Sequence, residues 1–204
     1  LKKLIIQVYS KEVNKNLIQK FNDSIQDLEK ELDKDDYNVI IDGNNILFFH
    51  DRQVNLNSFE RLNIIYNKIV DLSYKPFVII HIRHKNNLKK ILGKSHNIAK
   101  NILKQIKIFY TPYNMNDDWF FLRAWLYKEN SYLLTNDELK DHFFKINNDS
   151  SNITCNILKK LFENYILKYR YENGSYKVSE IFDYSIKIQK NDGIWHVPLT
   201  NDLS

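Results

Sequence analysis

YNVIIDG, at residues 37–43, is a short apolar run that ends in an aspartate and a glycine. Such a run is typical of a strand buried on both faces, and the Asp-Gly pair marks the place where it stops. Similar apolar runs follow at residues 76–82, 106–110 and 132–135. We expect each of the four runs to form a strand.

Segments with helical periodicity lie before and between these runs. Apolar residues recur at helical spacing over residues 11–34, which predicts one amphipathic helix. Ser58 is expected to cap the next helix, and more helices are predicted at 86–104, at 116–130 and from about residue 136. Alternating strands and helices favour the α/β class, with a parallel sheet flanked by helices on both faces.

The pattern changes after residue 153, where one more helix is followed by short strands around residues 165–171, 176–178, 183–189 and 194–197. We interpret these strands as a small antiparallel C-terminal β annex. The predicted organisation is a helical lead-in at 1–36, a central α/β domain at 37–150, and a C-terminal helix and β annex at 151–204 packed on it.

Composition narrows the classes of function. The single cysteine, Cys155, excludes a disulfide framework and any cysteine-rich zinc site within this chain. No apolar run approaches the roughly 18 residues that a membrane span needs. The net charge is +5, which is compatible with a nucleic-acid partner.

Basic residues gather in one stretch, residues 83–107, which contains eight lysines and arginines and no acidic residue. This pattern is typical of a nucleic-acid-binding face, and also of a solvated surface. The candidate RNA contacts in it are Arg83, Lys85, Lys89, Lys90 and Lys94.

Aspartates follow three of the predicted strands. Asp42 comes directly after the first, Asp117 and Asp118 come after the third, and Asp137 comes after the fourth. Because ligands bind outside the carboxyl ends of strands in parallel sheets, we expect these carboxylates to converge. Asp141 is expected on the same helix face as Asp137. Carboxylate oxygens suit Mg²⁺ or Mn²⁺, and two ions about 3.5–4 Å apart would neutralise their repulsion and support in-line attack on a phosphodiester.

Each of these aspartates also has a purely structural interpretation. Asp42-Gly43 is typical of a turn, and Asp117 and Asp137 are typical of helix N-termini, where the helix dipole favours them. Asp141 is typical of an exposed helix surface. Their joint placement at three strand ends favours the acidic metal site over these separate explanations.

Six segments, in order along the chain, resemble segments of one known family, protein-only RNase P, the metallonuclease that processes precursor tRNA. They lie between about residues 37 and 199. VIIDGNN (39–45) resembles the family's DGANV segment, and PFVIIHIRH (76–84) resembles its PLVVLHKRH strand. YTPYNMNDDW (110–119) resembles its ATPPGSNDDWYW segment, and LTNDELKDH (134–142) resembles its VTNDEMRDH segment. YSIKIQ (184–189) and WHVP (195–198) resemble its YSVVIQ and WHIP segments.

This resemblance implies a PIN-like nuclease fold of the NYN group over 37–150, and an endoribonuclease that uses Mg²⁺ or Mn²⁺ to leave a 5′-phosphate on mature tRNA. It implies an intracellular location, mitochondrial or nuclear. The resemblance assigns metal binding to Asp42, Asp117, Asp118 and Asp137. It places Asp141 in the same helix as Asp137, and suggests His142 as a supporting residue near the scissile phosphate. These six residues are the candidate catalytic residues.

The chain departs from the family pattern near the site. Asn44 replaces a small alanine, and Tyr113, Asn114 and Met115 replace the usual proline, glycine and serine. Family members also hold a structural zinc with a CxxC pair, the histidine of WHIP and a later cysteine. Only His196 matches that set, so we expect no structural zinc here.

Family members further carry an N-terminal pentatricopeptide-repeat domain that grips the tRNA elbow, and residues 1–36 are too short to be one. A protein partner or a missing N-terminal segment is therefore expected to bind the substrate, precursor tRNA. Two alternatives stay open: a metallonuclease that acts on another RNA, and a non-catalytic RNA-binding subunit of a larger assembly.

Overall fold

A five-stranded parallel sheet forms the centre of the protein. The computed structural model describes residues 2–12, 15–85, 104–148, 152–179, 189–191 and 193–197. The sheet has the strand order β3-β2-β1-β4-β5, and every pair in it is parallel. Its strands are β1 (Val39–Asp42), β2 (Pro76–His81), β3 (Ile108–Thr111), β4 (Tyr132–Leu134) and β5 (Ile166–Leu167).

The strand order reverses between β1 and β4. The chain first builds outward from β1 through β2 to β3, and then returns to the other side of β1 to add β4 and β5. In open parallel sheets such a reversal leaves a crevice outside the carboxyl ends of the two strands, where ligands bind. The fold therefore points to the ends of β1 and β4 as the place to look for a site.

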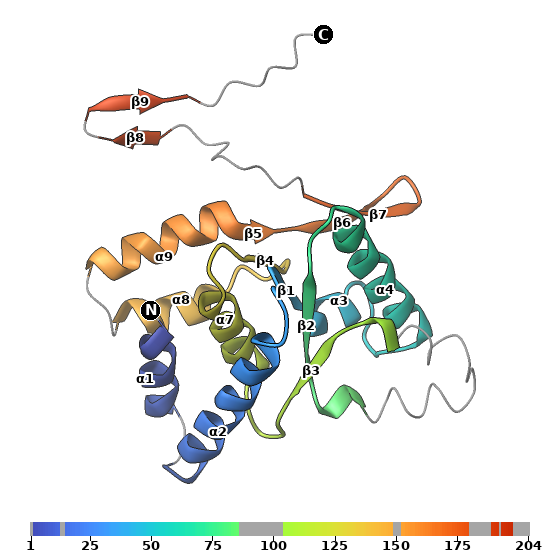
Figure 1. Cartoon of the computed structure of the whole chain (residues 1–204), viewed down its shortest axis with the longest axis horizontal. Coiled ribbons are helices and arrows are strands. Elements are labelled where there is room, and N and C mark those ends of the chain that lie inside the picture. The colour runs from blue at the N-terminus through green and yellow to red at the C-terminus, as the bar shows by residue number, and fades with distance from the viewer. Residues whose placement is uncertain are drawn as a thin grey trace.

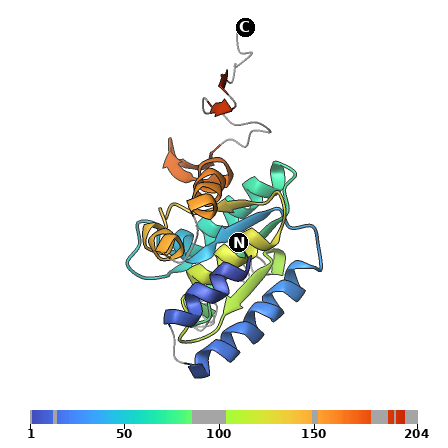
Figure 2. The same ribbon diagram turned by 90° about the vertical axis from the view of Figure 1, so that its left-hand side faces the viewer.

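Helices cover both faces of the sheet, as predicted (Figure 1). The strand residues alternate between two cores because successive side chains of a strand point to opposite faces. Ile40 belongs to one core, and Val39 and Ile41 belong to the other. Figure 2 looks onto the first face, where α1 and α2 lie in front of the sheet.

The first core is built with α1 (Lys2–Glu12), α2 (Lys15–Leu32), α7 (Asp117–Tyr127), α8 (Lys140–Asn148) and α9 (Asn152–Tyr165). The second core is built with α3 (Gly43–Leu47) and α4 (Leu56–Asp71). No helix in the part of the chain described above is both long enough and apolar enough to cross a membrane.

Two expectations about the helices need correction, and a third cannot be compared. The single helix predicted over 11–34 is two helices, α1 and α2. The cap of α4 is Asn55, whose side chain accepts from the backbone N–H of Ser58 at 3.1 Å, while the Ser58 hydroxyl accepts from the Asn55 N–H. Ser58 is thus the third helical residue of a reciprocal capping box and not the cap itself. The helices predicted at 86–104 fall mostly outside the described residues.

The strand predicted at 165–171 also needs correction. Its first part, β5, pairs in parallel with β4, because α9 carries the chain back along the sheet before β5 begins. The antiparallel part starts later, with β6 (Tyr169–Glu172) paired to β7 (Ser175–Val178), and β8 (Gln189–Asn191) paired to β9 (Ile194–His196). Figure 1 draws β8 and β9 apart from the main sheet. The division at residues 36 and 150 stays a prediction.

Gly43 allows α3 to start directly after β1 and lie close to β2. A Cβ atom at this position would lie 2.7 Å from the carbonyl oxygen of Ile79 and 2.8 Å from Cγ1 of Val78. Arg61 of α4 then holds the other end of α3, because its Nε donates to the carbonyl of Ile46 at 2.8 Å. The glycine of the Asp-Gly pair is thus needed for close packing as well as for turning the chain.

Candidate active site

Asp42 is the last residue of β1 and the N-cap of α3. Its Oδ1 accepts the backbone N–H of Asn45 at 3.0 Å, and its Oδ2 accepts the hydroxyl of Thr135 at 2.8 Å. Thr135 directly follows β4, so this second bond crosses the point where the strand order reverses. Both carboxylate oxygens are held in place, and the side chain is buried.

Asp117 and Asp118 form the first turn of α7, which follows β3. The Asn116 side chain caps this helix by accepting the N–H of Asp118 at 2.9 Å. The side-chain amide of Asn44 donates to Oδ2 of Asp117, and the Asn44 oxygen accepts the N–H of His81 at 3.2 Å. Asn44, which stands where the family has alanine, therefore connects the ends of β1 and β2 to the start of α7.

Asp137 lies in the loop between β4 and α8. Its N–H donates to the Thr135 hydroxyl at 3.1 Å, and its Oδ1 accepts the N–H of Leu139 at 2.9 Å. Since α8 begins only at Lys140, the expectation that Asp137 and Asp141 share a helix face is wrong. The side chain of Asp137 bonds to the backbone two residues on, a local turn that competes with helix formation.

Asp141 still lines the same pocket as two of the other aspartates, Asp118 and Asp137. It is exposed in the first turn of α8 and lines a pocket of about 390 Å³ together with Asp118, Asp137 and His142. The structure therefore brings Asp141 to the site, but from the helix that follows Asp137. Its role in catalysis stays a prediction.

The carboxylates are coupled electrostatically. The pKa of Asp42 is raised to about 8, chiefly by burial and in smaller part by the charges of Asp117 and Asp118, against the hydrogen bonds from Asn45 and Thr135 that lower it. Burial also raises the pKa of Asp118 to about 7, with contributions from Asp117 and Asp137. The charges of Asp117 and Asp118 thus act on Asp42, and those of Asp117 and Asp137 act on Asp118, so that the charged form of both raised carboxyls is disfavoured unless a cation is bound.

His142 lies beside Asp118. Its Nε2 is 3.4 Å from Oδ2 of Asp118 and 3.4 Å from the side-chain nitrogen of Asn116, and its ring packs edge-on against Trp119 at a centroid distance of 4.7 Å. The residue is buried. His142 is therefore placed beside the Asp118 carboxylate, and its role near the scissile phosphate stays a prediction.

The chemistry of these donors fits a divalent cation. Asp42, Asp117, Asp118 and Asp137 supply hard carboxylate oxygens, which Mg²⁺ and Mn²⁺ prefer, and their mutual repulsion favours a cation among them. Among the residues placed by the structure, no three Asp, Glu, His or Cys side chains gather into a closed metal cage. The carboxylates would have to converge further to hold a cation together.

A second set of side chains, which the sequence did not single out, ties the aspartates together. The Oδ1 of Asn45 accepts the N–H of Asn136 at 3.0 Å and the hydroxyl of Tyr169 at 2.6 Å. Asn136 also donates to the carbonyl of Tyr169 and accepts its N–H, at 2.8 and 3.1 Å. Asn45 and Asn136 each lie within three residues of an aspartate, and this closeness could have marked them as part of the site. Tyr169 is over a hundred residues away from Asn45, and nothing in the sequence connects it to the site.

His81 was also missed, although it obeys the rule that found the aspartates. It is the last residue of β2, and its pKa is lowered by burial and by Arg83 and raised by Asp117. The N–H of Arg83 donates to Nδ1 of His81 at 3.1 Å. Its place at the carboxyl end of a predicted buried strand was the signal in the sequence.

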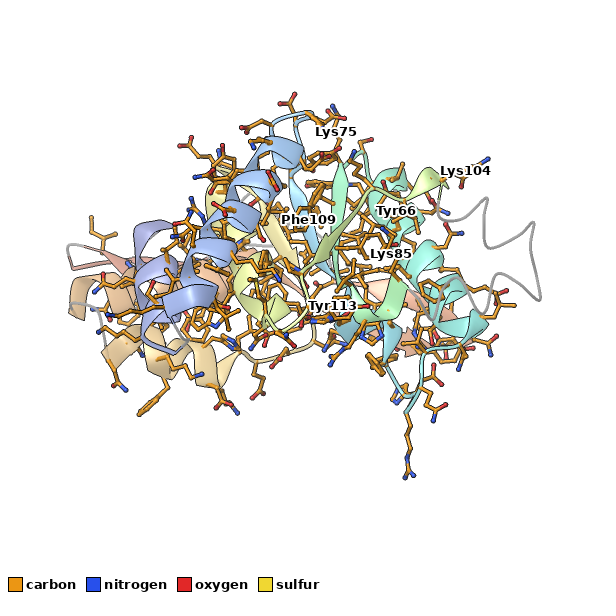
Figure 3. The ribbon with its side chains drawn as sticks, turned by 90° about the horizontal axis from the view of Figure 1, so that it is seen from below. Tyr66, Lys75, Lys85, Lys104, Phe109 and Tyr113 are labelled. Carbon is orange, nitrogen blue, oxygen red and sulfur yellow. The ribbon has the colours of Figure 1, made fainter. Side chains whose placement is uncertain are left out.

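Only part of the basic stretch can be placed. Arg83 and Lys85 are exposed; Nε of Arg83 donates to His84, and the ammonium of Lys85 lies 4.9 Å from the centre of the Tyr110 ring. Figure 3 shows Lys85 on the side of the molecule formed by β3. The other candidate RNA contacts, Lys89, Lys90 and Lys94, lie outside the described residues.

Comparison with known proteins gives the family. A profile described as protein-only RNase P matches residues 3–204. The chain belongs to the protein-only RNase P family. Proteinaceous RNase P 3 of Arabidopsis thaliana is 30% identical over 173 residues, which are 81% of this chain and 28% of that protein. Proteinaceous RNase P 2 of the same plant is 27% identical over 169 residues, 81% of this chain and 31% of that protein.

Solved protein-only RNase P structures share the fold. The crystal structure of nuclear proteinaceous RNase P 2 from A. thaliana matches with a TM-score of 0.62 and 25% identity, over 94% of this chain and 42% of that one. This agrees with the fold that the sequence segments implied. The chain spans 28% and 31% of the two curated relatives, so the activity of a whole protein-only RNase P is a proposal for it.

The prediction about zinc stays untested. In the protein-only RNase P resemblance, His196 is the single zinc ligand that this chain retains. Its backbone forms the end of β9, while its side chain lies outside what the structure describes.

Proposed function

We propose that this chain is the catalytic portion of a Mg²⁺-dependent RNase P that removes the 5′ leader of precursor tRNA. One observation carries the proposal: three strand ends bring Asp42, Asp117, Asp118 and Asp137 to one edge of the sheet, where the charge of Asp117 contributes to the raised pKa of both Asp42 and Asp118. The relatives, all named proteinaceous RNase P, supply the substrate class.

The reaction would be hydrolysis of one phosphodiester bond. Water attacks the phosphorus, the bond to the 3′ oxygen of the leader breaks, and the mature tRNA keeps a 5′-phosphate. Divalent cations held by the four aspartates would supply activation of the water and stabilisation of charge on the leaving oxygen.

Residues of the chain itself would set the geometry. Thr135 and Asn45 fix both oxygens of Asp42, and Asn44 fixes Asp117 relative to the ends of β1 and β2. His142 keeps the Asp118 carboxylate oriented toward the pocket. Orientation of this kind matters because misplacing a reacting group by about 1 Å can cost about 100-fold in rate.

The test is cleavage of a precursor tRNA by the purified chain under single-turnover conditions, with protein in excess. We expect cleavage in Mg²⁺, none in EDTA, and recovery when Mg²⁺ or Mn²⁺ is added back. An Asp137→Asn variant with an unchanged circular dichroism spectrum serves as the inactive control. Cleavage that continues in EDTA, or an equally active Asp137→Asn variant, would overturn the metal assignment.

A further inference from the structure

A second cavity adjoins the candidate active site. It has a volume of about 650 Å³ and lies between α8 and α9, with β5 at its base. Asp137 and Glu138 line both this cavity and the active-site pocket, so the two hollows share a wall. A strand of RNA positioned over Asp137 would therefore reach the second cavity, which we call the α8–α9 groove.

Two aromatic rings lie in the α8–α9 groove. Phe143 of α8 and Phe162 of α9 are both half-buried, and their rings meet at a centroid distance of 3.7 Å with an interplanar angle of 69°. Because both side chains are half-buried and line the cavity, part of their aromatic surface faces the groove. Aromatic surface beside a nuclease site is suited to stacking an RNA base.

The charges of the groove favour a base over a phosphate. Its lining contains three acidic residues, the shared Asp137 and Glu138 together with Glu163. It contains two basic residues, Lys159 and Lys168. The ammonium of Lys168 already donates to the carbonyl of Asp137 at 3.0 Å. Carboxylates would repel a phosphate deep in the groove, whereas they can accept hydrogen bonds from the amino and imino groups of a base. Lys168 sits at the shared wall, where the connecting backbone would pass.

We propose that the α8–α9 groove holds the unpaired base immediately 5′ of the scissile phosphate, and this inference rests on the proposed function. The volume of the groove is within the range of about 300–1,000 Å³ typical of ligand pockets. The base on the 3′ side of the cut is paired in the acceptor stem of a tRNA and cannot turn into a pocket. The leader base is free to do so.

Two substrates test this proposal: a precursor tRNA with a normal leader, and the same RNA with an abasic site immediately 5′ of the cut. Stacking of one base supports a preference of about 5- to 150-fold, so the wild-type chain should cleave the normal substrate with a kcat/KM higher by a factor in that range. Equal kcat/KM values for the two substrates would overturn the groove assignment while leaving the proposed function standing.

Variants then locate the base. Phe143→Leu keeps an apolar side chain but removes the ring, and should bring the ratio of the two kcat/KM values close to 1. Phe162→Leu removes the ring from the other wall and should also bring this ratio close to 1. It serves as a second test if Phe143→Leu folds poorly. The matched control is Phe144→Leu, because Phe144 is 67% exposed on the same helix and does not line the groove. Its ratio should equal that of the wild type.

A wild-type preference that survives both Phe143→Leu and Phe162→Leu, in variants that melt as cooperatively as the wild type, would also overturn the proposal. Failure of the wild-type chain to cleave either RNA would overturn the proposed function, and this inference with it.

Discussion

The hydroxyl of Tyr169 donates a hydrogen bond to Oδ1 of Asn45 over 2.6 Å. This bond connects the first residue of β6 to α3, the helix that follows β1, where the backbone N–H of Asn45 donates to Asp42. The same oxygen of Asn45 accepts the N–H of Asn136, next to Asp137. One tyrosine from late in the sequence thus supports both of the strand ends that flank the reversal of the sheet.

Tyr169→Phe tests this support by removing a single hydroxyl. We expect kcat to fall by about 2- to 10-fold, which corresponds to one hydrogen bond of about 0.5–1.5 kcal/mol, with KM for precursor tRNA unchanged. The control is Tyr171→Phe, since Tyr171 lies on the same strand and is 56% exposed. A fall in KM and kcat together, or no change in kcat, would show that Tyr169 does not position the site.

Asp118→Asn tests the carboxylate cluster. The change removes a charge but keeps the size of the side chain, so the fold should persist while cleavage falls by at least about 100-fold. Asp71→Asn, an exposed change at the end of α4, is the matched control and should cleave as the wild type does. Wild-type cleavage by Asp118→Asn at saturating Mg²⁺ would remove Asp118 from the site.

The raised pKa of Asp118 also makes a prediction about stability without metal. Because the pKa in the folded state, about 7, exceeds the ordinary aspartate value of 3.8, the carboxyl contributes stability that is present below about pH 4 and lost as pH rises to about 7. In EDTA, the melting temperature of Asp118→Asn should therefore exceed that of the wild type by a gap that widens between pH 4 and 7 and then stays constant.

Mg²⁺ at pH 8 should raise the melting temperature of the wild type more than that of Asp118→Asn, since a ligand that binds the folded state stabilises it. Differential scanning fluorimetry of both proteins across this pH range measures the gap. A gap that is constant from pH 4 to 8 would contradict the raised pKa.

Asn44→Ala restores the residue that the family has at this position. The change removes the bond to Asp117 and the bond from the His81 N–H. We expect the Mg²⁺ concentration for half-maximal cleavage to rise by about 2- to 10-fold, with the rate at saturating Mg²⁺ little changed, because Asp117 loses its fixed orientation. Asn67→Ala, at an exposed position on α4, is the control. An unchanged Mg²⁺ requirement would mean that Asn44 only fills space.

The strands of the central sheet and the aspartates at their ends could be predicted from short stretches of sequence. The run at 37–43 became β1 with Asp42 at its end, and the aspartates after β3 and β4 came to the same edge, because parallel strands all end at one edge of a sheet. Helix ends were predicted less well: Ser58 and Asn55 form a reciprocal pair, and residue types alone do not say which of the two is the cap.

Contacts between residues far apart in the sequence could not be predicted. No residue near Ile166 indicates whether β5 pairs with β4 in the parallel or the antiparallel direction. The direction depends on where α9 ends relative to the sheet. Likewise, the bond from Tyr169 to Asn45 joins residues that share no pattern. The missing information in both cases is tertiary, because pairing partners are chosen by the packing of the whole sheet.

The most direct test of the central claim is to map the products of precursor tRNA cleavage by this chain in Mg²⁺, to the nucleotide, and to determine their end groups. We predict products with a 5′-phosphate on the tRNA and a 3′-hydroxyl on the leader, formed at the mature 5′ end and absent with Asp118→Asn. A 2′,3′-cyclic phosphate on the leader, or identical cleavage by Asp118→Asn, would contradict hydrolysis at the aspartate site.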